Sequence, residues 1–351
     1  MIKILCHYPS ATDASSYYRG IGVMSNLYRI DETISHEMTS IVHWSVLKGS
    51  DILFMQRPFL NDHVHAIEMA KECNVKVWID YDDLLTNIPS CNPFLKQVKK
   101  SHNLSKENIK INVVKCLTLS DKITVSTEHL KVKLSEFVAA DKIVVIPNAH
   151  DDYFMPINNM KIDSNREKVI FWRGSESHKN DIYAFEDEIK KAMNDNPEFK
   201  FVFMGYNPKI FLGHKNFIHL DPTNNIMKYF KILDSIKPSI TIIPLEENDF
   251  NRSKSNIAAL ESIYYNSLPV TNLKHEWDKL SFITNKNNFS NDISVLINGD
   301  YSDTTKNIIK NGLPIDNLLT NYRHNFKKKF LLSEVNKKRI EIAKQLGGIY
   351  E

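Results

Sequence analysis

The sequence is poor in cysteine and has no long apolar run. Its four cysteines, Cys6, Cys73, Cys91 and Cys116, lie far apart, with neither a CxxC pair nor zinc-ligand spacing. We therefore expect reduced thiols rather than a disulfide framework. No segment approaches the ~20 apolar residues of a membrane span, and the chain enters a strand-like run at once, without a signal-peptide pattern. These absences predict a soluble, cytoplasmic protein, at most peripheral to a membrane.

A strong charge bias and a glycine-rich nucleotide fingerprint are also missing. The chain has 45 Lys and Arg against 42 Asp and Glu, a net charge of +3, which does not by itself imply a nucleic-acid partner. Because no GxGxxG motif is present, a dinucleotide-binding Rossmann site is a weak interpretation. The 351 residues, 42% of them hydrophobic, are enough for two domains with separate cores.

Short apolar runs alternate with helix-like segments along the whole chain. This alternation predicts an α/β protein with parallel sheets. A polar stretch at 151–166, which contains Pro156, reads as a linker. We therefore expect two Rossmann-like domains facing a central cleft, 1–150 and 167–315. The expected strands are 2–6, 51–57, 75–79, 122–126, 143–148, 169–174, 199–205, 240–244 and 268–271; the expected helices are 62–72, 94–115, a helix from Thr127, 224–234, 292–298 and most of 314–349.

The stretch 240–271 organises the second half of the chain. A buried strand end, a polar loop at 246–251, a helix with Ser253 or Ser255 as its N-cap and a second strand form a βαβ unit, whose loop is a ligand position. Lys254 is expected in or beside the first helical turn, where phosphate binds well. Glu261 follows seven residues later, roughly 10 Å along the same face. The pair suits the phosphates and ribose of a nucleoside diphosphate; a solvated Lys and a helix-surface Glu are the alternative.

A second loop adds cations after the strand 169–174. Arg173 and Lys179 stand six residues apart, and Gly174 between them lets the backbone approach a ligand closely. Two cations on one loop suit a leaving diphosphate, which gains charge as the glycosyl bond breaks. Tyr206, just after Gly205 at the end of another strand, is expected near the nucleotide base.

The segment Phe250 to Glu261, with Ser267, Pro269 and Val270 after it, resembles the donor-site signature of GT-B glycosyltransferases of the GT4 type. The resemblance implies that Arg173 and Lys179 clamp the diphosphate and act in catalysis, and that Glu261 grips the ribose. The family's earlier Glu is replaced here by Ser253, which puts a sugar contact at that position in doubt. The implied donor-binding set is Arg173, Gly174, Ser175, His178, Lys179, Gly205, Tyr206, Asn251, Lys254, Ser255, Asn256 and Glu261.

The same resemblance implies the reaction and its needs. The donor is a nucleoside-diphosphate sugar, with a UDP-sugar expected first, and the acceptor is a hydroxyl group of a polysaccharide, a lipid-linked glycan or modified DNA. Transfer occurs with retention, and no metal or other cofactor is required. A C-terminal helix at about 316–351 is expected to pack back on the first domain.

Acceptor-side candidates come from the first half. Tyr18 and Arg19 lie in the polar loop after the first strand, and Arg57 ends another. Asp80, Asp82 and Asp83 follow a buried strand, where carboxylates must be solvated, paired or functional. A DxD metal site belongs to a different glycosyltransferase fold, so the open alternatives are an acceptor-hydroxyl partner and a loop-capping cluster. Asp80 and Asp83 are the candidates for a catalytic base; if one lies opposite the diphosphate, inversion becomes credible.

The segment 94–115 is helical and basic. A solvated face is the default interpretation, and an anionic lipid surface or nucleic acid is the alternative. Other functions also stay open: a phage-type enzyme that glycosylates DNA bases, a sugar-nucleotide epimerase and a non-catalytic binding module. The basic patch consists of Lys96, Lys99, Lys100, Lys106 and Lys110, with Lys115 beyond them.

Overall fold

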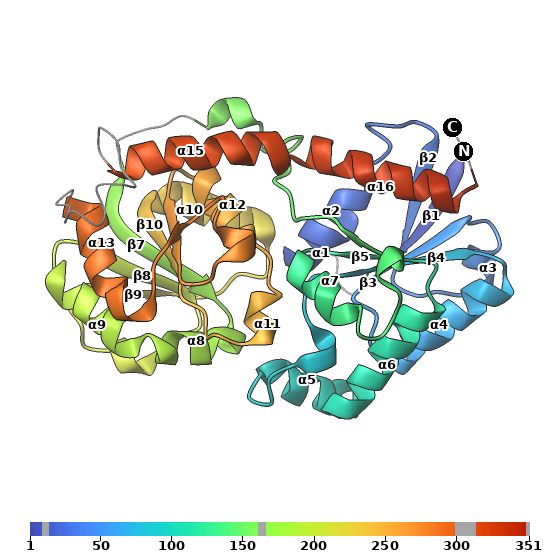
Figure 1. The fold of residues 1–351 in the computed structure, drawn as a ribbon, viewed down its shortest axis with the longest axis horizontal. Helices are drawn as coiled ribbons and strands as arrows, with labels where there is room; N and C mark the ends of the chain where they lie inside the picture. The colour runs from blue at the N-terminus through green and yellow to red at the C-terminus, as the bar shows by residue number, and fades with distance from the viewer. Residues whose placement is uncertain (9–13, 161–165, 299–313, 349–351) are drawn as a thin grey trace. The chain divides into compact units, whose positions relative to one another are not determined.

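The computed structural model describes all residues except 9–13, 161–165, 299–313 and 349–351 (Figure 1). Contacts divide the chain into two compact units. Unit 1 contains 1–149, 248–255 and 332–351, and unit 2 contains 150–247 and 256–331. The described residues of the expected linker 151–166 are grouped with unit 2, and the predicted domain boundaries stay a prediction. The assignment of the two halves as acceptor side and donor side stays a prediction.

Unit 1 is built on a six-stranded parallel sheet in the order β2-β1-β3-β4-β5-β6. Five of these strands were predicted, because each is a short apolar run. The sixth, β2, was missed because it is an edge strand in which only the first side chain is fully buried. The strands are β1 (Ile2–His7), β2 (Ile34–Thr39), β3 (Ile52–Gln56), β4 (Lys76–Tyr81), β5 (Lys122–Val125) and β6 (Ile143–Val145).

Helices surround this sheet, and two of their boundaries are set by capping side chains. Thr127 is the N-cap of α7, as predicted, and its hydroxyl accepts a hydrogen bond from the Leu130 amide at 3.2 Å. The predicted helix 94–115 is instead two helices, since Asn103 adopts a left-handed φ of 53° and Ser105 caps the second. The helices are α3 (Trp44–Leu47), α4 (Asn61–Glu72), α5 (Pro93–His102), α6 (Lys106–Leu119), α7 (Glu128–Leu134), α11 (Asp249–Arg252) and α16 (Leu332–Leu346).

The segment after β1 is partly helical, so the prediction of a polar loop over 7–22 is wrong for its second half. Short helices α1 (Ala14–Arg19) and α2 (Ile21–Met24) occupy it. The tyrosine and arginine at the end of α1 are buried, with Tyr18 at 3% and Arg19 at 0% exposure. The polar composition was misleading because Arg19 is neutralised inside the unit, as described below.

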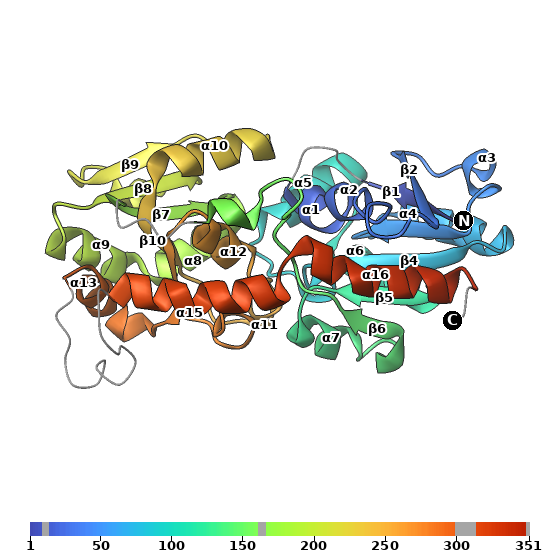
Figure 2. The ribbon, with the colours of Figure 1, turned by 90° about the horizontal axis from the view of Figure 1, so that it is seen from above.

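Unit 2 contains a second parallel sheet, in the order β12-β11-β10-β7-β8-β9. Side chains alternate between its faces: Ile170 and Trp172 join the core beneath α9, whereas Phe171 packs with Leu233 of α10. Figure 2 shows α10 and α9 on opposite sides of these strands. The strands are β7 (Glu167–Gly174), β8 (Lys200–Gly205), β9 (Phe217–Leu220), β10 (Pro238–Ile243), β11 (Leu268–Thr271) and β12 (Phe282–Ile283).

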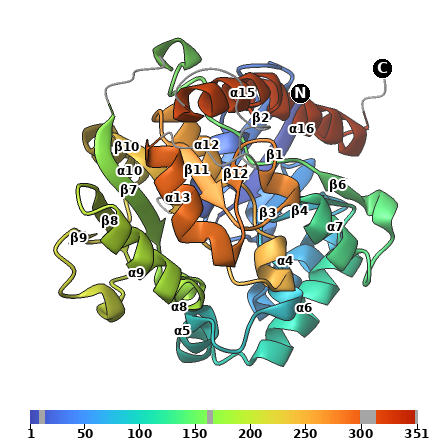
Figure 3. The ribbon, with the colours of Figure 1, turned by 60° about the vertical axis from the view of Figure 1, so that its left-hand side comes forward.

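The helices of unit 2 fill both faces of its sheet. α9 and α13 pack together over one face (Figure 3), with Phe185 and Phe289 rings edge to face at 5.2 Å. The predicted tail helix 316–351 is instead two helices, of which α15 belongs to unit 2 and α16 to unit 1. The helices are α8 (Lys179–Ala184), α9 (Glu186–Asp195), α10 (Ile226–Ile236), α12 (Ile257–Tyr264), α13 (Phe289–Asn298) and α15 (Pro314–Lys329).

The organising stretch 240–271 begins and ends in β10 and β11, as predicted, but its middle differs. Residues 249–252, expected in a loop, form α11, and helix α12 begins only at Ile257 with Asn256 as its N-cap. The N-cap predictions of Ser253 and Ser255 are therefore wrong. Lys254 lies three residues before α12, so it shares no helical face with Glu261, and that part of the spacing argument fails.

Candidate functional site

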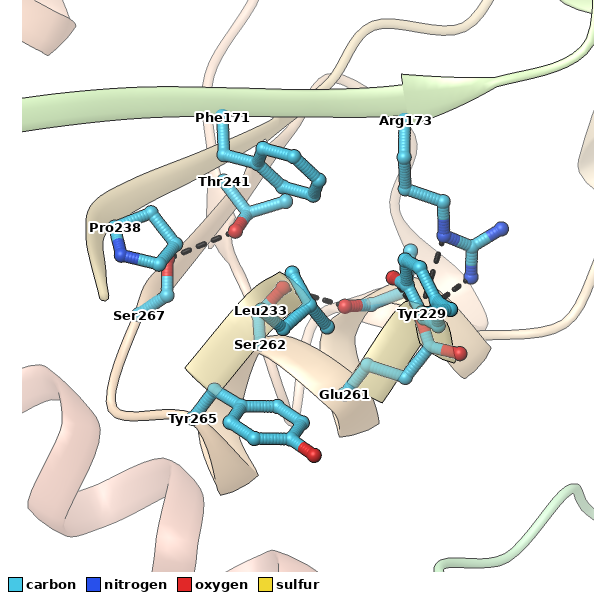
Figure 4. A pocket seen from close by; sticks show the side chains of 11 residues that line it. Phe171, Arg173, Tyr229, Leu233, Pro238, Thr241, Glu261, Ser262, Tyr265 and Ser267 are labelled. Atoms are coloured by element: carbon cyan, nitrogen blue, oxygen red, sulfur yellow. Dashed lines mark hydrogen bonds and ion pairs between the residues drawn. The ribbon is translucent and has the colours of Figure 1, made fainter. Parts of the chain in front are cut away.

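The most concentrated polar cluster of unit 2 joins three side chains from three elements. Arg173 at the end of β7 donates from Nε and Nη2 to Oε2 of Glu261 on α12, at 3.2 and 2.7 Å. The hydroxyl of Tyr229 on α10 donates to the same oxygen at 2.8 Å (Figure 4). The Arg173 guanidinium also lies over the Tyr229 ring, 5.8 Å from its centre. Glu261 is only 5% exposed, so these donors stabilise its buried charge.

A small recess lies beside this cluster, and Figure 4 shows the side chains that line it. Its volume of about 10 Å³ is space for one water molecule at most. Burial and the neighbouring Glu261 carboxylate raise the pKa of Tyr229 well above its usual value, so it stays a hydroxyl donor at neutral pH. The recess itself is too small for a nucleotide.

The carboxyl ends of β7 and β8 come close together beside the cluster. Gly205 has a left-handed φ of 104°, and a Cβ there would lie 2.3 Å from the Gly174 carbonyl oxygen. The Tyr206 amide donates to that same oxygen at 2.7 Å. Glycine is therefore required at both strand ends, and the turn after β8 is held against the loop after β7.

The loop after β7 carries the predicted phosphate-binding side chains. His178 Nδ1 lies 2.8 Å from Asp181 Oδ2, and the Lys179 ammonium lies over the Tyr183 ring at 5.6 Å. Tyr183 in turn hydrogen-bonds Tyr206; burial and this bond raise the pKa of Tyr206 to about 12. Ser175, Lys179 and Tyr183 are exposed, so this edge of the sheet presents cations and hydroxyls to solvent.

The remaining predicted donor residues divide between the units. Lys254 and Ser255 belong to unit 1, where the Lys254 ammonium lies over the Phe250 ring at 5.5 Å and Ser255 Oγ accepts from Asn148. Asn251, also in unit 1, is 4% exposed. Asn256 belongs to unit 2 and donates to the Glu276 carbonyl oxygen at 3.0 Å. The structure thus brings Arg173 and Glu261 together, while a common site with Lys254 stays a prediction.

Two of the acceptor-side candidates form a buried ion pair in unit 1. Arg19 donates to both oxygens of Asp80 at 2.8 and 2.6 Å, and further to the Ile146 carbonyl and Asn148. Asp80 is 1% exposed and also accepts from Thr124. These hydrogen bonds pair the two groups inside the unit, and the acceptor-side role expected for Arg19 and Asp80 stays a prediction.

The neighbouring carboxylates lie nearer the surface and share one arginine. Arg57 Nη2 donates to Asp83 at 2.8 Å, and its Nε lies 3.3 Å from Asp82 Oδ1 without hydrogen-bond geometry. Burial, opposed by Arg57 and assisted by the Asp83 charge, raises the pKa of Asp82 to about 6. Arg57 itself adopts a left-handed φ of 50°, a strained conformation for a long side chain. Asp82 and Asp83 thus keep an acceptor-side role as a prediction.

The basic patch lies on α5 and α6. Lys96, Lys99 and Lys100 are exposed at i, i+3 and i+4 of α5, on one helix face. Among the described residues none of the three forms an ion pair, although surface lysines elsewhere, such as Lys71 with Asp121, do. Lys106 is also exposed, and Lys110 lies 5.9 Å from the centre of the Phe137 ring.

Neither a metal-binding cluster nor a membrane-spanning helix occurs in the described part of the chain. No three His, Cys, Asp or Glu side chains there are grouped so that they could hold a metal ion. Within the same residues, every helix is too short or too polar to cross a membrane.

Comparison with solved structures identifies the fold. A glycosyltransferase from Rickettsia africae matches with a TM-score of 0.63 at 14% identity, over 98% of each chain. Anabaena HepE, solved with UDP and glucose, matches with 0.63 at 11% identity, over 98% of this chain and 100% of that one. A Listeria monocytogenes protein assigned as a UDP-N-acetylglucosamine 2-epimerase matches with a TM-score of 0.56 at 11% identity, over 100% of this chain and 98% of that one. The two parallel six-stranded sheets with flanking helices are therefore the GT-B fold. No family model and no curated protein matches the sequence.

Two residues of the candidate site, Tyr229 and Asp181, were not predicted as functional from sequence. Tyr229 was predicted only to face inward on its helix, because nothing in sequence tells a packed tyrosine from one whose hydroxyl meets a carboxylate. Asp181 was noted only as the start of a helix. Its position three residues after His178 was an available signal, since side chains at i and i+3 meet on a helix.

Proposed function

We propose that the protein transfers a sugar from a nucleoside-diphosphate sugar to a hydroxyl acceptor. Unit 2 binds the donor at the carboxyl ends of β7, β8 and β10, the edge where ligands bind in open parallel sheets. Arg173, His178 and Lys179 contact the diphosphate, Glu261 holds the ribose, and Tyr206 lies near the base. The donor is a UDP-sugar, as supported by HepE, whose structures contain UDP and UDP-glucose.

The observation that carries this proposal is the Arg173–Glu261–Tyr229 cluster. A cation and a carboxylate side by side at a strand end match a ligand with phosphates at one end and ribose hydroxyls beside them. Charge on the diphosphate increases as the glycosyl bond breaks, so fixed cations stabilise the transition state more than the ground state. The GT4-type resemblance supports retention, in which the departing phosphate oxygen assists the incoming hydroxyl.

Ligand-induced thermal stabilisation tests the donor site. UDP, GDP, ADP and their sugars are screened with the wild type, since a ligand at 100 times its Kd stabilises the native state by about 2.7 kcal/mol. Arg173→Ala and Glu261→Gln should each remove most of the shift. Glu186→Ala and Lys231→Ala, on α9 and α10, are matched controls that should keep it. If both site variants respond like the wild type, the donor site is misplaced.

A sugar-nucleotide epimerase is a second candidate, because one GT-B neighbour carries that assignment. Such an enzyme changes the donor in the absence of an acceptor. NMR analysis of UDP-N-acetylglucosamine incubated with the protein alone separates the two functions: an epimerised or hydrolysed sugar supports the epimerase, and an unchanged donor supports the transferase. A non-catalytic module would bind UDP and show no turnover with any acceptor.

The unpaired lysines of α5 favour a third candidate, glycosylation of modified bases in DNA. Each phosphate contact contributes to a steep salt dependence of DNA binding. For this function, Lys99→Glu with Lys100→Glu should abolish DNA binding and modification and leave UDP binding intact. Unchanged DNA modification in this variant would exclude the lysines from the acceptor site.

A further inference from the structure

His178 is held by a carboxylate that is itself buried. Its Nδ1 lies 2.8 Å from Oδ2 of Asp181, which is 3% exposed and sits in the first turn of α8. The other oxygen of Asp181 accepts from the Glu246 amide at 2.8 Å, in the loop after β10. One carboxylate therefore connects the loop after β7 to the loop after β10.

The imidazole ring is also fixed by packing. It meets the Trp172 ring edge to face at 6.5 Å between centres. A Cβ at Gly174 would lie 3.1 Å from His178 Cδ2 and 2.6 Å from the Trp172 ring, so Gly174 is what leaves room for this arrangement. Carboxylate, indole and glycine together determine where the ring lies.

This geometry also determines which ring nitrogen carries the proton. A buried carboxylate accepts hydrogen bonds, so the nitrogen facing it must be Nδ1–H. An ionised Asp181 also stabilises the imidazolium, in which Nε2–H becomes a second donor. A hydrogen bond from such a charged donor to phosphate is among the strong ones.

We propose that Asp181 is a positioning residue, which orients His178 so that its Nε2 edge meets the donor diphosphate and which fixes the loop after β10 at the same time. This inference rests on the proposed function. Asp181 touches no substrate itself; it acts through His178. A merely structural Asp181 would hold the Glu246 amide and leave nucleotide binding independent of His178.

A double-mutant cycle separates these roles. UDP affinity is measured by calorimetry for the wild type, His178→Ala, Asp181→Asn and the double variant. His178→Ala should weaken UDP about 10- to 100-fold, the range of one hydrogen bond to a charged group. Asp181→Asn should weaken UDP less, because a neutral ring protonated on Nε2 can still donate to phosphate without the imidazolium charge. The double variant should bind no more weakly than His178→Ala, because Asp181 acts only through the imidazole. An additive loss, with Asp181→Asn equally harmful when His178 is absent, would overturn the inference.

The position of the proton on His178 can be measured by NMR spectroscopy without any ligand. Long-range 1H–15N correlation spectra assign the proton on His178, whose signal among the 13 histidines is the one missing in His178→Ala. The wild type should carry the proton on Nδ1, and Asp181→Asn, whose amide can donate, should move it to Nε2. A wild-type ring protonated on Nε2 alone would refute the inference even if Asp181→Asn does not fold. If the wild type binds no nucleoside diphosphate, the proposed function fails; if it binds and the cycle is additive, only this inference fails.

Discussion

Three charged side chains are buried together in unit 1: the guanidinium groups of Arg19 and Arg339 and the carboxylate of Asp80. Burial, and then the neighbouring Arg19, lower the pKa of Arg339 to about 9, although Asp80 opposes this. Arg19 and Arg339 are 0% and 1% exposed. Asp80 is therefore the counter-charge on which both arginines depend, and removing a buried counter-charge costs more than the pair itself contributes.

We predict that Asp80→Asn lowers the free energy of unfolding by about 3–5 kcal/mol, because it leaves buried arginine charge uncompensated. Urea denaturation followed by circular dichroism measures this. Asp83→Asn is the matched control: Asp83 and Arg57 are each about one quarter exposed, so its loss should cost under about 1 kcal/mol. Equal stability of the two variants would show that the buried pair is not stabilising.

His63 is the residue with the clearest pH response. Its Nδ1 accepts hydrogen bonds from the Phe59 and Leu60 amides at 2.9 and 3.2 Å, so the folded ring is neutral. Burial, with smaller effects of His7 and His102, lowers the pKa of His63 to about 3. The ring in the unfolded chain binds a proton near pH 6.5. The contribution of His63 to the free energy of unfolding is therefore fully present above that pH and is lost as the pH drops toward 3.

The predicted size of this loss is about 1 kcal/mol between pH 7 and pH 5.5, from one proton bound only by the unfolded chain. His63→Asn is the reference, because its side-chain oxygen can accept the same amides without titrating. As the pH falls from 7 to 5.5, the free energy of unfolding of the wild type should decrease relative to that of His63→Asn by about 1 kcal/mol. A difference independent of pH would mean that folded His63 titrates normally.

At the scale of single residues, the sequence indicated which residues belong to the candidate site but not which residues they contact. Arg173 and Glu261 were predicted in one ligand site, yet their direct ion pair was not, because they are 88 residues apart and only the fold brings them together. The burial and pairing of Arg19 were not predicted, because sequence alone does not reveal them, and its substrate contact stays a prediction. The donor role of Arg173 and Glu261 stays a prediction.

At the scale of elements, the contact between the carboxyl ends of β7 and β8 is tightly constrained. Gly205 combines a left-handed φ with a backbone oxygen 2.3 Å from the position of an added Cβ. Gly213 has a similar φ of 97° but nothing within 4 Å of such a Cβ. The two glycines therefore separate the cost of backbone strain from the cost of steric overlap.

We predict that Gly213→Ala costs about 1–2 kcal/mol, the price of a left-handed alanine. Gly205→Ala should cost roughly 1–3 kcal/mol more, because strand ends must move apart to admit the methyl group. It should also weaken UDP binding, since Gly174 and Tyr206 would shift. Chemical denaturation measures the free energy of unfolding of both variants, and titration measures their UDP affinity. An equal loss of unfolding free energy in Gly205→Ala and Gly213→Ala would show that the contact between the ends of β7 and β8 is not tight.

Element types were largely predictable, because apolar runs bounded by polar segments define the buried strands of parallel sheets. Boundaries failed where the local backbone departed from the pattern. The start of α12 was predicted too early because Ser253 and Ser255 are favoured N-cap residues, whereas the helix begins after Asn256, whose side chain makes no cap hydrogen bond. The segment 94–115 was predicted as one helix because Asn103 gave no strong break signal. Strand β2 was not predicted because an edge strand needs few buried side chains, so its sequence lacks an apolar run.

At the scale of the whole molecule, α16 is the last described helix of the chain but belongs to unit 1 with the first 149 residues. Asn336 donates to the Val23 carbonyl at 3.0 Å, and Arg339 lies against the Arg19–Asp80 pair. Five apolar side chains of α16 are also buried: Leu332, Val335, Ile340, Ile342 and Ala343. Fully burying a valine, leucine or isoleucine side chain stabilises by about 1.5–3 kcal/mol, so the sum over the four larger side chains is comparable to the whole stability of a domain, about 5–15 kcal/mol.

Truncation after Leu331 should therefore unfold unit 1 selectively. Unit 2 has its own core and ends at Leu331, so it loses none of its residues. Hydrogen exchange measured by mass spectrometry should show protection lost in peptides from β1 to β6 and kept in peptides from β7 to β11. Lys338→Ala, which changes an exposed side chain on the same helix, is the control and should leave both sets protected. Loss of protection in both sets at once would mean that the two units fold as a single cooperative body, and retention in both would mean that α16 is dispensable to unit 1.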